Sequence, residues 1–147
     1  MAAITTIDLV LHTANVTGAG TDADVYLGLA GREFYVDSSL NDFEQGQNIT
    51  YTFGVNPNVL NAGDNDPTQP LQLDTADLDR FPNRYIRMDP RGDGSGPNWV
   101  IEEVTVTVTS GQLSLRKFSR LGGNDTLKLG RKAGKFLYLN DDGGIVT

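Results

Sequence analysis

Cysteine is absent from this chain of 147 residues, and histidine and tryptophan occur once each. Without cysteine the chain can form neither a disulfide nor a thiolate metal site, and an enzyme with a cysteine nucleophile is excluded. Because His12 is the only histidine, carboxylates are the abundant groups for acid–base chemistry, and no stretch singles out a catalytic pair. Fingerprints of serine hydrolases, P-loop proteins and dinucleotide-binding proteins are missing as well. We therefore expect a protein that is not an enzyme.

Long apolar runs are also missing. No stretch approaches the roughly 20 residues of a membrane-spanning helix. The first ten residues, MAAITTIDLV, have neither the charged start nor the apolar centre of a signal peptide. The sequence predicts a soluble protein with no signal peptide and leaves its compartment and oligomeric state open.

Basic residues are scarce in most of the chain. Residues 1–115 contain 16 acidic and 5 basic residues, which gives a net charge of −11, whereas residues 116–135 contain 7 basic residues and Asp125, which gives +6. An acidic body suits cation binding and argues against nucleic acid as a partner. The basic segment could meet an anionic lipid, a phosphate or an acidic partner, or it could be a solvated hairpin that balances the acidic body.

Helical periodicity is rare, and short alternating runs bounded by Gly, Asn, Asp and Pro recur instead. This pattern predicts an all-β fold, a two-sheet antiparallel β-sandwich. The longest run, 99–109, changes parity between Ile101 and Val104, so we predict a β-bulge at Glu102-Glu103. The strands that we expect are 7–13, 24–29, 33–36 (after a turn at Ala30-Gly31), 48–53, 85–88, 99–109 and 113–118.

Two further segments complete the predicted organisation. Residues 56–83 form a long insertion, in which 75–81 predicts one helical turn capped by Asp74 or Thr75. Residues 127–129 and 136–139 predict an added C-terminal β-hairpin that turns at 130–134. We therefore expect a sandwich domain over 1–118 and a basic hairpin extension over 119–147.

The stretch Gly18–Leu29, GAGTDADVYLGL, begins as a polar turn and continues as a strand. Gly18 and Gly20 can adopt positive φ and leave their carbonyl oxygens uncovered, and Thr21 and Asp22 add side-chain oxygens. Clustered carbonyls and a carboxylate at the start of a strand suit calcium. The alternative is an ordinary β-turn between two strands.

Three stretches in order resemble one known family. They are TGAGTDADVYLGL at 17–29, NDFEQG at 41–46, and the run from Ile86 to Val108 that contains the tryptophan. Together they resemble a PLAT domain (LH2, lipoxygenase homology), the β-sandwich found at the start of lipoxygenases and at the end of pancreatic-type lipases. The resemblance covers roughly 4–118, interrupted by the insertion at 56–83.

The resemblance implies one or two calcium sites at one end of the sandwich. They are expected to be weaker than the family's fullest sites, with a dissociation constant of about 10⁻⁴ M, because Ala23 and Asn98 stand where other members have acidic residues. Asp93 could reach the same place. The alternative is that these side chains only cap turns or face water. The implied ligands are the carbonyls of Gly18, Ala19 and Gly20 and the side chains of Asp22, Asn41, Asp42, Glu44 and Asn98.

The resemblance also implies a function, a non-catalytic calcium-binding module that docks a lipid surface or a protein partner. Members that bind membranes carry aromatic residues at the calcium end. Here the corresponding positions are Thr17 and 94–96, and none is aromatic, which favours a protein partner. A carbohydrate-binding module is an alternative, with Tyr35, Tyr51, Tyr85 and Tyr138 as candidate stacking residues. A structural or assembly domain that makes contact through the basic hairpin is another.

Overall fold

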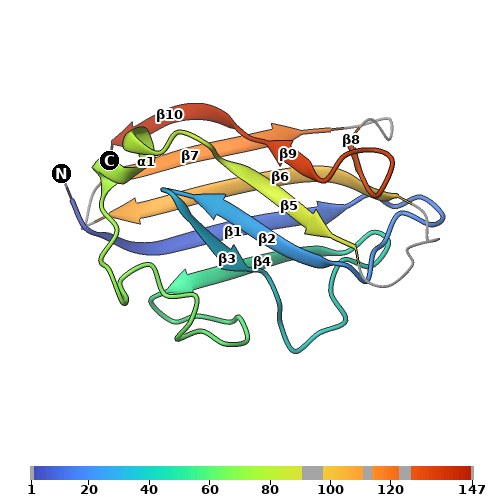
Figure 1. Ribbon diagram of the computed structural model, residues 1–147, viewed down its shortest axis with the longest axis horizontal. Coiled ribbons are helices and arrows are strands. Elements are labelled where there is room, and N and C mark those ends of the chain that lie inside the picture. Colours follow the sequence, from blue (N-terminus) through green and yellow to red (C-terminus); the bar gives the residue numbers. More distant parts are fainter. Residues whose placement is uncertain (1, 91–97, 111–113, 123–126, 147) are drawn as a thin grey trace.

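A computed structural model describes residues 2–90, 98–110, 114–122 and 127–146 of the chain. These residues form two antiparallel sheets packed face to face, with one short helix (Figure 1). The predicted all-β sandwich is therefore confirmed. In chain order the elements are β1 (Ile4–Thr13), β2 (Asp24–Leu29), β3 (Arg32–Tyr35), β4 (Asn48–Gly54), α1 (Thr75–Arg80), β5 (Tyr85–Asp89), β6 (Trp99–Ser110), β7 (Ser114–Leu121), β8 (Leu127–Leu129), β9 (Phe136–Tyr138) and β10 (Asn140–Val146).

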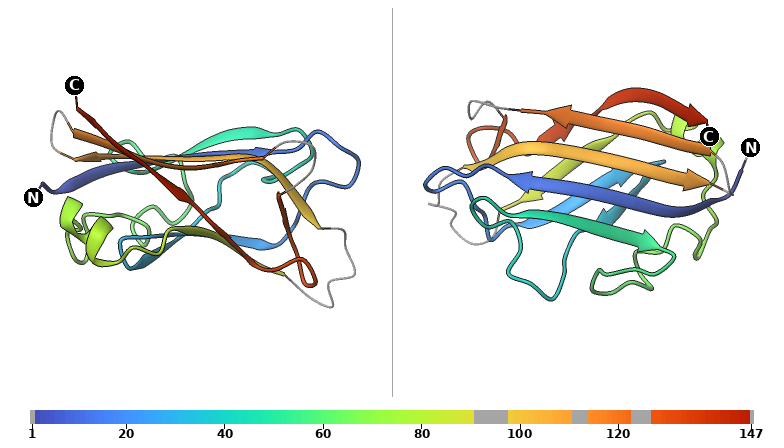
Figure 2. Two further views of the ribbon diagram at one scale, coloured as in Figure 1. Left: turned by 90° about the horizontal axis from the view of Figure 1, so that it is seen from above. Right: turned by 180° about the vertical axis from the view of Figure 1, so that it is seen from behind.

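The two sheets differ in size, with six strands in the first and four in the second. The first sheet has the order β10-β7-β6-β1-β4, and β8 pairs with the beginning of β6. The second sheet has the order β3-β2-β5-β9. Figure 2 shows the two layers edge-on, and the chain passes between them several times. No helix in the described part of the chain is long and apolar enough to span a membrane.

The core lies between the layers and follows the predicted alternation. Ile7, Leu9 and Leu11 point inward from β1, and the apolar residues of β2 face them from the second sheet. This arrangement arises because alternate strand residues point to opposite faces, so one row of apolar side chains can leave water together. The largest fully buried side chains are Trp99, Tyr51, Phe34, Phe53 and Phe118.

The predicted bulge in β6 is confirmed. Along the β1–β6 ladder His12 is opposite Glu103, whereas the next residue, Thr13, is opposite Ile101. Glu102 is therefore the extra residue, and it changes the parity of the strand. As a result Ile101 and Val104 both face the core although three positions separate them.

Two local predictions in the loops are also confirmed. Asp74 caps α1, because its carboxylate accepts from the amides of Ala76 at 2.8 Å and Asp77 at 3.3 Å, while the Asp77 carboxylate accepts from the Asp74 amide at 2.9 Å. This reciprocal pattern is a capping box. The β2–β3 hairpin turns at Ala30 and Gly31, whose φ angles are 54° and 78°, as a two-residue type I′ turn requires.

The C-terminal segment differs from the predicted added hairpin in how its strands pair. The strands lie where we expected them, and Gly130 and Gly134 bridge the turn. However, β8 pairs with β6 of the first sheet and β9 pairs with β5 of the second. Each of the two strands pairs with a sheet, which buries its leucines. These are Leu127 and Leu129 in β8 and Leu137 in β9. Strand β7 extends past its predicted end at residue 118 and reaches Leu121. Strand β10, which we did not predict, pairs with β7.

Candidate functional site

The loops that carry the predicted ligands lie at one end of the sandwich. Figure 1 shows the β1–β2 and β8–β9 connections at the end opposite to both termini and α1. We call this the loop end and define it by residues 14–23, 36–47, 98–100 and 128–135. The opposite end, which carries both termini and α1, is called the terminal end.

Three segments that are far apart in the sequence meet at the loop end. The amide of Thr21 donates a hydrogen bond to the carbonyl of Phe43 at 3.0 Å, and the amide of Val100 donates to the carbonyl of Ala19 at 2.9 Å. The Cα of Gly20 approaches the Phe43 carbonyl so closely that an added Cβ would lie 2.8 Å from that oxygen. Only glycine fits there without moving the backbone. The three stretches of the resemblance therefore lie next to one another in the fold.

A buried aromatic pair anchors these loops to the core. Phe43 has a φ of 61° and is 6% exposed, and its ring centroid lies 5.3 Å from that of Trp99. Trp99 is fully buried, and its indole Nε1 donates to the Thr13 hydroxyl at 3.0 Å. A buried indole N–H needs such a partner. Both rings therefore belong to the core of the sandwich.

Asp42 holds the β3–β4 connection together. Its carboxylate accepts hydrogen bonds from the Ser38 amide at 2.9 Å, the Ser38 hydroxyl at 2.6 Å and the Tyr51 hydroxyl at 2.9 Å. Burial, reinforced by the bond to Asp42, raises the pKa of Tyr51 well above its usual value. Asp42 thus already has a structural role in this loop.

Asp22 and Glu44 are placed differently. Asp22 is exposed, and no described residue donates a hydrogen bond to its carboxylate or to the carbonyls of Gly18 and Gly20. Gly18 is exposed and has a φ of 78°. The Glu44 carboxylate accepts a hydrogen bond from the side-chain amide of Asn41. Asp22 and Gly18 are exposed, whereas Gly20 and Glu44 are half-buried, so a cation could reach the oxygens of Asp22 and Gly18 most easily.

The remaining predicted ligands are more constrained. The Ala19 carbonyl already accepts from Val100, and Ala19 is fully buried. The Asn98 amide oxygen lies directly over the backbone of Gly130. Within the described ranges, no group of three or more His, Asp or Glu side chains lies close enough together to hold a metal, so a cation here would depend on backbone carbonyls. Asp93 lies outside the described residues.

Exposed basic side chains share the loop end. They come from β8 and the β8–β9 connection and are Lys128, Arg131, Lys132 and Lys135. The other described cations of the basic segment include Arg120, which donates to the Tyr138 carbonyl at 3.2 Å, and Arg116, which lies in an ion-pair network. The sequence identified the basic segment but could not show that part of it lies beside the predicted calcium loops.

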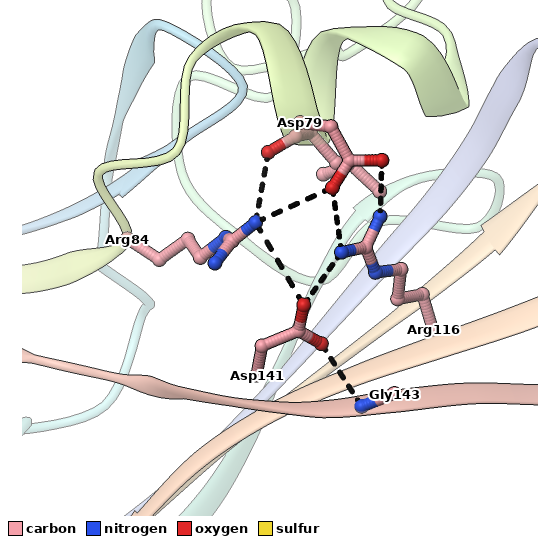
Figure 3. Close-up of polar contacts among 6 residues, drawn as sticks. Asp79, Arg84, Arg116, Asp141 and Gly143 are labelled. Atoms are coloured by element: carbon pink, nitrogen blue, oxygen red, sulfur yellow. Dashed lines mark hydrogen bonds and ion pairs between the residues drawn. The ribbon is translucent and has the colours of Figure 1, made fainter.

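The ion-pair network joins α1 to the C-terminal strands (Figure 3). Arg116 of β7 donates two hydrogen bonds to Asp79, at 2.7 and 3.0 Å, and one to Asp141 at 2.6 Å. Arg84 lies within 4 Å of both carboxylates, and the guanidinium carbons of Arg84 and Arg116 lie 4.6 and 5.3 Å from the Phe118 ring centroid. The bonds to Arg116 lower the pKa values of Asp79 and Asp141.

Comparison with known proteins gives matches at the level of fold. No family model matches the chain, and no curated protein matches it in sequence. Among solved structures, the alpha toxin from Clostridium absonum matches with 21% identity and a TM-score of 0.57, over 95% of this chain and 32% of the toxin. Two lipoxygenase variants, one of them in complex with arachidonate, each match with 16% identity and a TM-score of 0.55, over 92% of this chain and 16% of the lipoxygenase.

These likenesses show the fold. The chain spans about a third of the length of the toxin and about a sixth of that of the lipoxygenase, so it is similar to a part of each protein. Lipoxygenases are also proteins in which the PLAT domain occurs, so the structural match agrees with the resemblance seen in the sequence.

Proposed function

We propose that this chain is a non-catalytic docking module that brings its loop end to an anionic lipid surface, with calcium bound in the loops. The observation that carries the proposal is the location of the exposed cations. Lys128, Lys132 and Lys135 lie at the same end as the loops that resemble a calcium site. A negatively charged surface would therefore contact these lysines and the loops at the same time.

The expected energies are sufficient for reversible docking. A basic side chain near an anionic leaflet contributes about 1 kcal/mol, so several together produce measurable binding. Asp22 and Glu44 would oppose this approach, and a bound calcium ion would neutralise them. Leu40, which is 60% exposed and directly precedes Asn41, supplies an apolar side chain near these loops.

We propose a calcium ligand set that follows the accessibility of the oxygens. The Asp22 carboxylate and the carbonyls of Gly18 and Gly20 would provide the first ligands, and Glu44 with Asn41 would provide the others. Asp42 would act mainly by holding the loop through Ser38 and Tyr51. Calcium accepts such mixtures of carbonyl, carboxylate and water oxygens.

The non-catalytic role is supported by the extent of the structural matches. The neighbours align with this chain over a third of their length or less, as expected for an accessory domain. An acidic protein surface is the second candidate partner, because the same exposed lysines would attract it.

Vesicle co-sedimentation tests the proposal. Binding to vesicles of phosphatidylserine and phosphatidylcholine would be compared with binding to phosphatidylcholine alone, with calcium or with a chelator. We expect Lys132→Glu and Lys135→Glu each to weaken binding at least about fivefold. Lys117→Glu is the matched control, because it makes the same change in net charge on β7, away from the loop end.

Two results would argue against this function. Equal binding to both kinds of vesicle would remove the role of anionic lipid. Equal losses for Lys117→Glu and Lys132→Glu would mean that net charge matters and the loop end does not. If vesicles do not bind but an acidic protein does, and Lys132→Glu abolishes that binding, the second candidate replaces the first.

A further inference from the structure

We propose that the outer face of the second sheet is a binding site for a neutral oligosaccharide, formed by a platform of aromatic side chains. This aromatic platform consists of Tyr26, Tyr35, Tyr85, Phe136 and Tyr138. It lies on the flank of the sandwich and includes no residue of the proposed calcium loops. The inference is therefore independent of the proposed function.

Strand register places these residues side by side. Tyr85 of β5 is opposite Tyr138 of β9 on one side and Gly28 of β2 on the other. In the next row Arg87 is opposite both Phe136 and Tyr26, and Tyr26 is opposite Tyr35 of β3. Directly opposed residues on one face of a sheet are near enough for their side chains to touch. The rows therefore form one continuous surface across all four strands.

Gly28 lets the Tyr85 ring lie against the sheet. A Cβ added to Gly28 would collide with three carbon atoms of that ring. The Tyr85 hydroxyl donates to the Glu33 carboxylate of β3 at 2.8 Å, so the side chain extends from β5 over β2 to β3. Burial and the bond to Glu33 raise the pKa of Tyr85 to about 12. The Tyr85 side chain is therefore held at its backbone by β5 and at its hydroxyl by Glu33 without any ligand.

Two exposed rings, those of Phe136 and Tyr138, lie beside the Tyr85 ring. Phe136 is 46% exposed and Tyr138 is 56% exposed, and their rings are nearly parallel, with an interplanar angle of 12°. Both meet the Tyr85 ring steeply, at 63° and 68° and at centroid distances of 5.1 and 6.1 Å. The Tyr85 ring thus forms the base of the platform, and the rings of Phe136 and Tyr138 form one side of it.

Planar polar groups border the rings. Arg87 and Glu33 form a two-point pair, with Nε–Oε2 at 2.8 Å and Nη2–Oε1 at 2.9 Å, and the guanidinium carbon lies 4.1 Å from the Tyr26 ring centroid. Next to Glu33 and Tyr85 is a cavity of about 290 Å³, which Arg80, Phe81 and Asn83 also line. This volume is at the lower limit of pockets that bind small molecules.

The chemistry of this face matches a sugar. A pyranose with equatorial substituents presents a flat face of C–H groups, which the negative face of an aromatic ring attracts. Its hydroxyl groups point outward in the plane of the ring, where carboxylate, guanidinium and amide groups can bind them. β-Linked glucose oligomers have this shape, and the platform combines both kinds of contact.

The other possible partners fit less well. The outward charged residues are Asp24, Glu33 and Asp89 against Arg87, so an anionic lipid or a nucleic acid would be repelled. In the described strands of this sheet the outward positions hold no aliphatic side chain, so the aromatic rings lie among polar groups, as a ligand with both C–H faces and hydroxyl groups requires. The outward residues are Asp24, Tyr26, Gly28, Glu33, Tyr35, Tyr85, Arg87, Asp89, Phe136 and Tyr138.

The test is calorimetric titration with cellohexaose and laminarihexaose, together with an array of neutral glycans. We expect binding that persists in a calcium chelator and weakens about tenfold for Tyr138→Ala or Phe136→Ala. Gly28→Ala should also weaken binding, because it displaces Tyr85. Leu71→Ala is the control, since Leu71 is 76% exposed and is not part of the platform. Circular dichroism and the melting temperature establish that each variant is folded.

Three outcomes would overturn the inference. The folded wild-type chain could bind no neutral glycan. It could bind one with an affinity that Phe136→Ala and Tyr138→Ala leave unchanged. It could instead bind a protein or anionic vesicles through this face, with loss of that binding in the same two variants.

Discussion

The two ends of the sandwich use charge in opposite ways. Near the terminal end, Arg84 and Arg116 bind Asp79 and Asp141, so these four charges satisfy one another. At the loop end Lys132, Lys135 and Asp22 are exposed, and no ion pair of theirs is found among the described residues. Paired charges can stabilise the fold, whereas exposed charges remain available for a cation or a charged surface. We therefore propose that docking occurs through the loop end.

The largest expected effect concerns the anchor beneath the loop end. Trp99→Ala removes a fully buried indole that contacts Phe43 and Thr13, so we expect a loss of about 3–5 kcal/mol in the free energy of unfolding. Denaturant unfolding measures it. A loss below about 1 kcal/mol would mean that the loops do not depend on this anchor.

A second variant distinguishes two aspartates at the same end. Asp42→Ala leaves the buried Tyr51 hydroxyl without its acceptor, which should cost about 1–3 kcal/mol. Asp22→Ala should change stability little without calcium, because Asp22 is exposed. Tyr51→Phe in the Asp42→Ala background is the control and should add little further loss. Equal effects of the two alanine variants would contradict the separate roles.

Calcium should stabilise the chain through the exposed aspartate. At ten times a dissociation constant of about 10⁻⁴ M, calcium adds about 1.4 kcal/mol, which raises the melting temperature by about 5 °C. Asp22→Asn should abolish this rise, and thermal unfolding with calcium or chelator measures it. A rise of equal size in the variant would remove Asp22 from the ligand set.

The smallest effect is expected at the terminal end, where water reaches the ion pairs and weakens them. Arg116→Ala should lower stability most at neutral pH. Because Arg116 lowers the pKa values of Asp79 and Asp141, its contribution is complete above their ordinary value of about 3.9 and is lost as the pH falls through the lowered values.

Unfolding at pH 7 and pH 2 therefore measures this contribution. The difference in stability between the wild type and Arg116→Ala should shrink at the lower pH. A difference that stays constant would show that packing against Phe118 matters and charge does not.

Much of the fold was predictable because strand signals are local. Alternation identified the central strands, and the parity change in β6 located the bulge at Glu102. The pairing of the C-terminal segment was not predictable, because nothing in 127–139 specifies which sheet each strand joins. Strand β10 begins with the polar sequence NDDGG, which shows no apolar alternation, so its pairing with β7 appears only in three dimensions.

The candidate sites were predictable to different degrees. The convergence of the Gly18, Asn41 and Asn98 segments agrees with the resemblance, whereas the bonds of Asp42 depend on Tyr51, which only the fold brings near. The sequence named Tyr35, Tyr85 and Tyr138 as possible sugar-stacking residues, and all three lie on the platform. It also named Tyr51, which is buried at 1%, and it did not name Tyr26 or Phe136, because their neighbours are set by strand register.

Fluorescent labels at the two ends test whether the chain docks through its loop end. Because the chain has no cysteine, Thr17→Cys at the loop end and Leu71→Cys near the terminal end each accept one environment-sensitive dye. With phosphatidylserine vesicles and calcium, we expect a blue shift for the dye at residue 17, reversed by chelator, and no shift for the dye at residue 71. A shift at residue 71 alone, or equal shifts at both positions, would contradict docking through the loop end.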